Sequence, residues 1–312
     1  MIKCYSISQS ALYACTSRKK LAKLLYYEPI KNFAIDDVIF YCSFYIPKKN
    51  KKNGQLEQRK ITKPKDELKQ IQNRIYDLIK YIETPDYLHS GVKLRSYVTN
   101  ANVHRFSNYM VTIDISNFYD NCKRNNVYNF WHNICKCAAD ISCILTDLVT
   151  YEGKIPTGCS TSQRIAFFSY KQMFDELNDL AQRYNCLFSV FVDDLTFSSQ
   201  SSINMSSLVA EVKRILKKYG HSAKDRKIKF YGEHKPKFVT GVAITTNHEL
   251  RASNKLQMQL KENLKKDIDF QSEHELRRII GQINAIRRVW SNGSKFLTAK
   301  ARARKRLKAL KA

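Results

Sequence analysis

Residues 186–199 read CLFSVFVDDLTFSS, an apolar run that leads into two adjacent aspartates, Asp193 and Asp194, and then alternates apolar and polar residues. This pattern predicts a β-hairpin with a carboxylate pair at its tip. Two like charges at a tight turn repel each other and cost folding energy. The pair therefore favours a bound cation, most simply Mg²⁺.

A second strand pattern upstream ends in another carboxylate. Residues 109–121 read YMVTIDISNFYDN, and Asp114 closes the β-rich part of this stretch. One aspartate on a strand and an aspartate pair on a neighbouring hairpin are what a two-metal nucleotidyl-transfer site requires, with metals about 3.5–4 Å apart that clamp the attacking and leaving oxygens. The sequence therefore predicts a polymerase-type site that binds two Mg²⁺ ions.

An Asp-Asp pair alone is weak support, because most such pairs are solvated turn residues. Asp36-Asp37, in NFAIDDVIF, illustrates this ordinary case. It lacks a partner strand, and we interpret it as a helix start or a surface turn. The pair at 193–194 differs because an apolar strand precedes it and an ordered series of other elements surrounds it.

The charge of the chain points to a polyanionic partner. Its 312 residues include 54 Lys and Arg against 28 Asp and Glu, a formal net charge of +26. Nucleic acid explains such an excess most simply. Membrane binding is the competing explanation, but no stretch approaches the roughly 18 apolar residues of a spanning helix, and MIKCYSISQS at the N-terminus has no signal-peptide core. We therefore expect a soluble cytoplasmic protein without a membrane partner.

The nine cysteines form no CxxC pair. His132, Cys135 and Cys137 make an HxxCxC cluster, but a fourth ligand at the spacing usual for zinc is missing. Small buried hydrophobes in a reducing compartment are the favoured interpretation of these cysteines.

Helical and strand patterns alternate along the chain, which predicts an α+β fold in which helices back an antiparallel sheet. The helix that begins at Pro64 or Asp66 and stops at Thr84-Pro85 has the clearest amphipathic pattern. The basic region from Arg251 is either a nucleic-acid contact or a solvated helical face. We expect helices in the first forty residues and over 127–150, 161–184, 206–220 and from about 250, and strand pairs within 39–64 and 227–245.

The order of these elements resembles the fingers, palm and thumb of reverse transcriptases, and more narrowly the retron reverse transcriptases of bacteria. FVDDLTFSS is similar to the family's catalytic hairpin, with Phe191-Val192 in place of Tyr-Ala, and Asp114 matches the first palm carboxylate. The resemblance implies a right-hand polymerase architecture. Its parts would be N-terminal helices and fingers over 1–105, a palm over 106–235 with a fingers–palm loop at 151–165, and a basic helical thumb and tail over 236–312.

The resemblance also implies residues that bind the incoming deoxynucleotide. In RKITKPKDELKQIQNRI (59–75), Arg59 and Lys60 would meet the triphosphate, although an ordinary basic hairpin explains them equally well. Tyr119, five residues after Asp114, is similar to the ring that clashes with a ribose 2′-OH and so selects deoxynucleotides.

IPTGCSTSQ (155–163) is similar to the family's Leu-Pro-Gln-Gly-x-x-x-Ser-Pro loop. Gly158 and Ser162 match it, and glycine would permit close backbone approach to the nucleotide and template. Thr157, Ser160 and Gln163 depart from it, which puts fidelity in doubt. The Gly-x-x-x-Ser-Gln form also resembles the enzymes of diversity-generating retroelements.

Two short elements favour the retron subfamily. TNANVHR (99–105) contains Asn100 and His104 of an Asn-Ala-x-x-His element, and FVTGVAI (238–244) contains Val239, Thr240 and Gly241 of a Val-Thr-Gly element. The resemblance implies that these residues engage the structured primer-template RNA. The alternative for each is ordinary, since a lone histidine is more often a satisfied structural residue.

The resemblance assigns catalysis to Asp114, Asp193, Asp194 and Lys227. The three carboxylates, with Ile115 beside the first, would hold the two Mg²⁺ ions. Lys227 would act as a general acid, or would neutralise charge near the leaving pyrophosphate. Its alternative role is phosphate contact elsewhere on a basic surface.

The expected activity is RNA-templated DNA synthesis. If the chain is retron-like, it uses dNTPs to copy its cognate noncoding RNA into a branched, RNA-linked single-stranded DNA (msDNA), and it acts in antiphage defence with a separately encoded effector protein. Three alternatives remain: a diversity-generating or other defence-type reverse transcriptase, a group II intron enzyme, and a catalytically idle RNA-binding scaffold.

Overall fold

The computed structural model describes residues 4–28, 41–49, 56–290 and 296–310. The Asp36-Asp37 pair lies outside these residues. The chain forms two compact units, each built from three separate segments. Unit 1 comprises Met1–Lys93, Ile115–Leu180 and Val209–Lys224, and unit 2 comprises Leu94–Asp114, Ala181–Leu208 and Asp225–Ala312.

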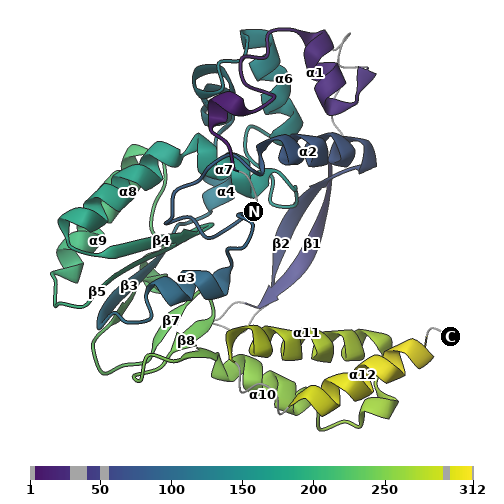
Figure 1. Cartoon of the computed structure of the whole chain (residues 1–312), viewed down its shortest axis with the longest axis vertical. Coiled ribbons are helices and arrows are strands. Elements are labelled where there is room, and N and C mark those ends of the chain that lie inside the picture. Colours follow the sequence, from purple (N-terminus) through teal and green to yellow (C-terminus); the bar gives the residue numbers. More distant parts are fainter. Residues whose placement is uncertain (1–3, 29–40, 50–55, 291–295, 311–312) are drawn as a thin grey trace. The chain divides into compact units, whose positions relative to one another are not determined.

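The predicted basic hairpin and the helix after it are both present in unit 1 (Figure 1). Strand β1 (Tyr41–Lys49) pairs antiparallel with β2 (Leu56–Pro64), and α2 (Asp66–Ile79) follows directly. Asp66 and Glu67 lie in the first turn of α2, where carboxylates complement the helix dipole. The apolar side chains buried along α2 are Leu68, Ile71, Ile75 and Ile79.

Two other helical predictions for unit 1 need correction. Of the first forty residues, a 3-10 turn (Ile7–Gln9) and α1 (Arg18–Leu25) are the described helical parts, and Leu12 lies in a turn. The helical stretch expected over 127–150 is present but interrupted. It divides into α5 (Arg124–Asn129), a π-helical turn (Phe130–Ile134) and α6 (Ala139–Val149). Lys136 has a φ of 58°, a left-handed conformation that interrupts the helix.

The helices that precede and follow the predicted hairpin in the sequence agree with the prediction more closely. The stretch 161–184 forms α7 (Ser162–Ser169) and α8 (Lys171–Arg183), separated at Tyr170. Helix α9 (Met205–Lys218) ends just before Gly220, whose φ of 77° suits a helix C-terminus. A short α4 (Phe118–Asn121) follows the first aspartate strand.

Unit 2 contains an antiparallel sheet of four strands in the order β4-β5-β3-β6. The aspartate hairpin supplies β4 (Leu187–Phe191) and β5 (Asp194–Ser199), and β5 pairs with β3 (Tyr109–Asp114), as the sequence predicted. β6 (Lys229–Tyr231) pairs with the other edge of β3. Helix α3 (Tyr97–Val103) precedes β3 and contacts β4.

A second, smaller sheet in unit 2 was not foreseen. The expectation of one strand pair over 227–245 is wrong, because β6 joins β3 whereas β7 (Lys237–Val239) pairs with β8 (Val242–Ile244). β9 (Leu250–Ala252) completes this three-stranded sheet. Ala101 of α3 packs with Val239, Val242 and Ile244 in its core.

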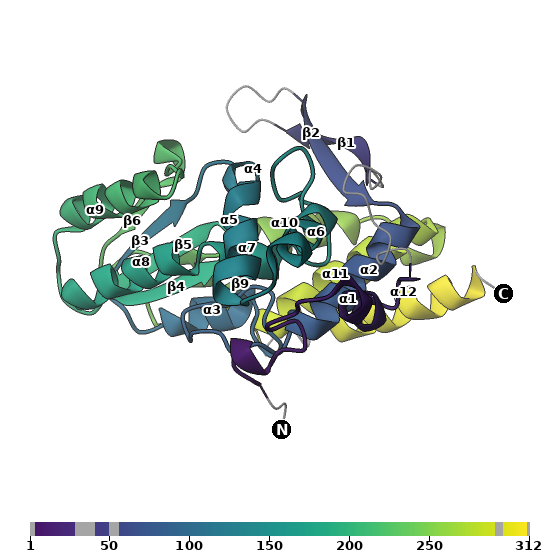
Figure 2. The same ribbon diagram turned by 90° about the horizontal axis from the view of Figure 1, so that it is seen from above.

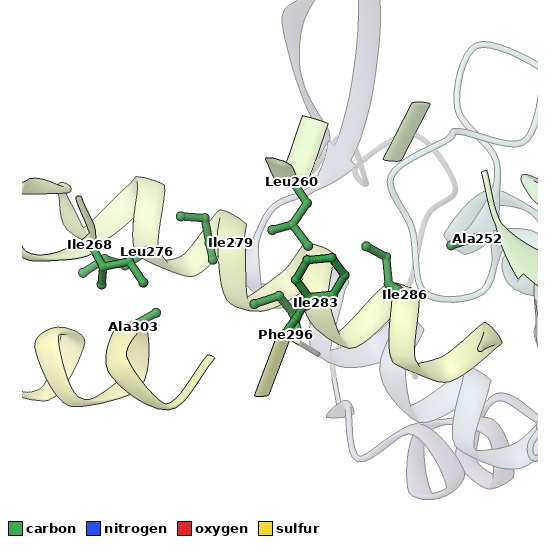
Figure 3. Close-up of a cluster of buried hydrophobic side chains, with 9 residues drawn as sticks. All are labelled: Ala252, Leu260, Ile268, Leu276, Ile279, Ile283, Ile286, Phe296 and Ala303. Carbon is green, nitrogen blue, oxygen red and sulfur yellow. The ribbon is translucent and has the colours of Figure 1, made fainter. Parts of the chain in front are cut away.

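The C-terminal region is helical, as expected. Helices α10 (Asn254–Asn263), α11 (Glu273–Val289) and α12 (Leu297–Ala309) lie side by side (Figures 1 and 2). A capping box between Ser272 and Glu275 starts α11. The apolar face of α11 supplies the centre of a buried cluster (Figure 3), which consists of Ala252, Leu260, Ile268, Leu276, Ile279, Ile283, Ile286, Phe296 and Ala303.

The α+β class is therefore confirmed, since antiparallel sheets and helices make up the described chain. The part boundaries at residues 105 and 235 stay predictions. No helix within the described ranges is both long and apolar enough to span a lipid bilayer.

Candidate active site

Asp114 and Asp194 lie directly opposite each other on neighbouring strands. The antiparallel register of β3 and β5 ends in this pair, which places both carboxylates at the same end of the sheet. Asp114 is 7% exposed, and Asp194 is half-buried. Strand pairing thus brings together two acidic residues 80 positions apart in the sequence.

Asp193 lies in the turn between β4 and β5. Phe191 pairs with Asp194, so that Val192 and Asp193 form a two-residue turn. Val192 has a φ of 61° and Asp193 does not share this positive φ, which is the pattern of a type II′ hairpin turn. Glycine is the usual residue at the first position of this turn, and a β-branched residue there is strained. The backbone strain of this turn therefore lies at Val192, directly before Asp193.

Lys227 is the basic residue beside the carboxylates. It closes the 3-10 turn Asp225–Lys227, and its Nζ donates a hydrogen bond to Oδ2 of Asp114. The Lys227 side chain is half exposed, whereas the Asp114 side chain is 10% exposed. Lys227 thus neutralises part of the charge that the aspartates concentrate here.

The pKa of the Asp194 carboxyl group also reflects its burial and the neighbouring carboxylates. Burial, followed by the charges of Asp193 and Asp114, raises the pKa of Asp194 to about 6, and Lys227 and Lys229 oppose this shift. A carboxylate with a raised pKa in such surroundings gains stability from a nearby cation. This donor set of aspartate oxygens is the kind that Mg²⁺ prefers.

Asp114 and Asp194 fit a divalent ion by their pairing and charge. Asp193 is displaced onto the turn: within the described ranges, no three His, Cys, Asp or Glu side chains are grouped as a metal-binding cluster. Ile115, which we expected beside the metals, is fully buried, and its main chain forms an isolated antiparallel bridge with Ala223. The structure thus pairs Asp114 with Asp194 across β3 and β5, and Asp193 lies in the adjoining turn, one position before Asp194.

Residues 46–244, which include all three aspartates, match the family model "Reverse transcriptase (RNA-dependent DNA polymerase)". The chain belongs to the reverse transcriptase family. This membership implies a polymerase fold with a palm and fingers and the use of divalent metal ions, generally Mg²⁺.

Curated relatives of this reverse transcriptase family member come from retrons, which confirms the retron resemblance. The chain is 32% identical over 172 residues to the "Retron Se72 reverse transcriptase" of Salmonella heidelberg (strain 579083-10), which covers 54% of this chain and 43% of that protein. It is 28% identical over 217 residues to the "Retron Ec48 reverse transcriptase" of Escherichia coli, which covers 65% of this chain and 52% of that protein. It is 24% identical over 196 residues to the "Retron Ec86 reverse transcriptase" of Escherichia coli, which covers 62% of this chain and 61% of that protein. The chain thus spans about half the length of these relatives.

The two basic residues expected at the triphosphate lie on β2, in unit 1. Arg59 is in register with Ile46, and Lys60 with Tyr45. Consecutive strand positions alternate between the two faces of a hairpin, so positions 59 and 60 belong to different faces. Lys60 is exposed and lies 3.5 Å from Glu152, a separation at which an exposed ion pair contributes little.

Gly158 and Ser162 shape the loop in which they lie. The Gly158 N–H donates to the carbonyl oxygen of Thr62 on β2, and a Cβ at this position would lie 2.5 Å from that oxygen. The buried Ser162 hydroxyl donates to the carbonyl of Pro156. These contacts give both residues a structural role, and their contact with a nucleotide stays a prediction.

Tyr119 is half-buried on α4, beside a ring cluster of unit 1. Its neighbour Phe118 is buried against Tyr170, Phe174 and His221, so it anchors the short helix. Tyr119 packs on Phe118 at a ring-centroid distance of 5.6 Å. Its part-exposed position is compatible with the nucleotide-selecting role, which stays a prediction.

The Asn-Ala-x-x-His element is buried. Asn100 and His104 are both 0% exposed on and just after α3, so neither side chain is available at the surface. The His104 ring lies 2.6 Å from the Ser198 hydroxyl through Nδ1 and 2.7 Å from the Ser189 hydroxyl through Nε2. His104 thus ties both strands of the aspartate hairpin to α3. Direct RNA contact by these two side chains, as expected from the sequence, is incompatible with this burial.

The Val-Thr-Gly element forms the turn between β7 and β8. Val239 is fully buried, Thr240 is half-buried and Gly241 is exposed. The Thr240 hydroxyl contacts α3, where Asn100 lies. The two short elements, 140 residues apart, therefore meet in unit 2.

Sequence reasoning missed two groups of residues. Ser189 and Ser198, the partners of His104, are small polar residues at buried positions of apolar strands, and that pattern was the available signal. The second group lies within the basic region predicted from Arg251, whose individual residues the sequence did not single out, and it lines a groove along α11 and α12. We name it the basic groove; its lining residues are Arg277, Arg304, Lys305, Leu307 and Lys308.

The HxxCxC cluster is part of a core. Cys135 and Cys137 are buried, as predicted, and burial raises the pKa of the Cys137 thiol to about 11. The Cys137 carbonyl lies 3.0 Å from Nδ1 of His132. A thiol with a raised pKa is a poor nucleophile and a poor metal ligand, which fits a structural role for it.

Proposed function

We propose that this chain is the RNA-directed DNA polymerase of a retron, which copies its cognate structured noncoding RNA into branched, RNA-linked single-stranded DNA (msDNA). The observation that carries the proposal is the pairing of Asp114 with Asp194 at one end of β3 and β5, with Asp193 in the adjoining turn. The retron names of several curated relatives support the subtype.

In this proposal Asp114, Asp193 and Asp194 hold two Mg²⁺ ions. Bound there, the metals would activate the attacking hydroxyl and stabilise the leaving pyrophosphate. Lys227 holds the Asp114 carboxylate, so it orients that ligand and limits the repulsion between the aspartates. A role of Lys227 as general acid toward the pyrophosphate remains part of the proposal.

The incoming dNTP would contact β2 at Arg59 or Lys60 and the Gly158–Ser162 loop, with Tyr119 excluding a ribose 2′-OH. The basic groove would bind the sugar–phosphate backbone of the hybrid in a salt-dependent, largely sequence-independent manner, as a thumb does. Folded RNA supplies specificity through its shape. We further propose that the protein acts in the bacterial cytoplasm, in antiphage defence, with an effector encoded separately.

The test is expression of the chain with its native flanking DNA, followed by purification and separate RNase and DNase digestion of the bound nucleic acid. Wild-type protein should carry a discrete single-stranded DNA whose mobility shifts after RNase treatment. Asp193→Asn/Asp194→Asn should abolish the DNA, whereas Asp140→Asn, an exposed carboxylate paired with Arg18, should retain it. RNA without DNA in the wild-type sample would instead favour an RNA-binding scaffold.

A further inference from the structure

The β7–β8 hairpin turns through two residues that both have positive φ. Val239 pairs with Val242, and the central residues Thr240 and Gly241 have φ values of 46° and 86°. Positive φ at both positions is the signature of a type I′ turn, which favours Asn-Gly and Gly-Gly. Gly241 suits its position, but threonine is β-branched and rarely adopts positive φ. The turn therefore needs support at Thr240.

Helix α3 supplies that support through two hydrogen bonds. The Thr240 hydroxyl donates to the carbonyl oxygen of Tyr97 at 3.0 Å, and Nδ2 of Asn100 donates to the same hydroxyl at 3.4 Å. A hydroxyl has one proton to give. Since that proton goes to Tyr97, the hydroxyl must accept from Asn100, and this fixes the orientation of the carboxamide.

The surroundings make Asn100 a buried and specific partner. Its side chain is 0% exposed, while Ala101 beside it packs against Val239 and Val242, the residues that flank the turn. Helix α3 therefore supports the β7–β8 hairpin through both the hydrogen bonds and this packing. Gly241 is exposed, and a Cβ built there has no atom within 4 Å among the described residues. The backbone at Gly241 is thus open to a close-approaching ligand.

We propose that Asn100 is a positioning residue that holds the Thr240–Gly241 turn in its left-handed conformation, so that the exposed turn presents its backbone to the folded RNA. The proposal rests on the proposed function, because it takes a structured RNA as the ligand. Asn100 acts through Thr240 and does not touch the RNA itself.

The test is a double-mutant cycle on RNA affinity. Thr240→Asn creates an Asn-Gly sequence, which forms a type I′ turn by its own preference and should no longer need Asn100. Dissociation constants for RNA transcribed from the native flanking DNA would be measured for wild type, Asn100→Ala, Thr240→Asn and the double variant. Asn102→Ala, an exposed asparagine of the same helix, is the matched control, and thermal unfolding would check that each variant is folded.

Asn100→Ala should weaken binding about fivefold in the wild-type background, the factor expected for one neutral hydrogen bond. In the Thr240→Asn background the same change should cost less than about twofold, because coupled residues are not additive. An equal loss in both backgrounds, or no loss in either, would overturn the role of Asn100. A wild-type protein that binds this RNA no better than a scrambled RNA would overturn the proposed function as well.

Discussion

At the scale of single residues, Gly158 shows how a motif glycine can serve packing. Its N–H bonds the Thr62 carbonyl, and an added Cβ would lie 2.5 Å from that oxygen. Gly158→Ala should therefore lower the free energy of unfolding by about 1–3 kcal/mol, as overpacking does. Urea denaturation would measure it. Gly232→Ala is the control, since its Cβ meets no described atom within 4 Å; equal effects of the two changes would contradict this reasoning.

His221 gives unit 1 a dependence on pH. Burial among Phe118 and Tyr170, with Lys123 nearby, lowers its pKa from 6.5 to about 4. The unfolded chain therefore binds more protons between these two pH values, so stability rises with pH there and is lost as pH falls toward 4. Relative to a His221→Leu variant, the wild type should lose about 2–3 kcal/mol of unfolding free energy between pH 7 and pH 4.

The measurement for His221 is chemical denaturation of both proteins at each pH. His234→Leu, a change at an exposed histidine, should leave the pH dependence of the wild type intact. A difference between the wild type and His221→Leu that stays constant from pH 7 to pH 4 would show that His221 does not titrate as argued.

The positions of individual site residues were predictable from the sequence where an acidic residue directly adjoins a clear strand pattern. Asp114, Asp193 and Asp194 stand at the ends of clear strand patterns, so their approach followed from pairing. Sequence alone did not reveal that His104 would be buried, because burial depends on which strands α3 meets. It also could not show that the hydrogen bond of Ser162 closes its own loop, since that bond depends on the path of the chain.

At the scale of elements, His104 links α3 to both strands of the aspartate hairpin. His104→Ala would remove two buried hydrogen bonds and leave Ser189 and Ser198 without these contacts. We expect faster amide hydrogen exchange in β4 and β5, with exchange in α12 unchanged, because local stability can fall in one cooperative unit. Hydrogen exchange by mass spectrometry measures this. Ser201→Ala, at an exposed position, is the control; unchanged exchange in both strands would contradict the bracing role.

Elements with strong periodicity were predicted well. The helix from Asp66, the basic hairpin and the aspartate hairpin all have repeats that match a helix or a strand. The interruption within 127–150 was not predicted, because the apolar residues of this stretch continue through the interruption at Lys136. In 227–245, strand pattern was visible, but the division of β6 and β7 between two sheets depends on partners far away in the sequence.

At the scale of the whole molecule, the net charge of +26 predicts salt-dependent binding of nucleic acid. If the basic groove contacts phosphates, Lys305→Gln/Lys308→Gln should reduce the slope of log affinity against log salt by about 2, roughly one per lost phosphate contact. Titration of an RNA–DNA hybrid at several salt concentrations gives this slope. The matched control is Lys19→Gln/Lys23→Gln on α1; the same change of slope for both pairs would show that net charge, and not the groove, determines binding.

The division of the chain into interleaved segments also bears on how the protein is made. The chain passes between units 1 and 2 five times, at 93/94, 114/115, 180/181, 208/209 and 224/225. Neither unit can therefore be completed on the ribosome before residue 224 has emerged, and the emerging strands of the aspartate sheet must wait for distant partners. Domains usually fold one after another during synthesis. Here β3 (Tyr109–Asp114) is synthesised long before its partners β5 (Asp194–Ser199) and β6 (Lys229–Tyr231), so the aspartate sheet is completed only late in translation.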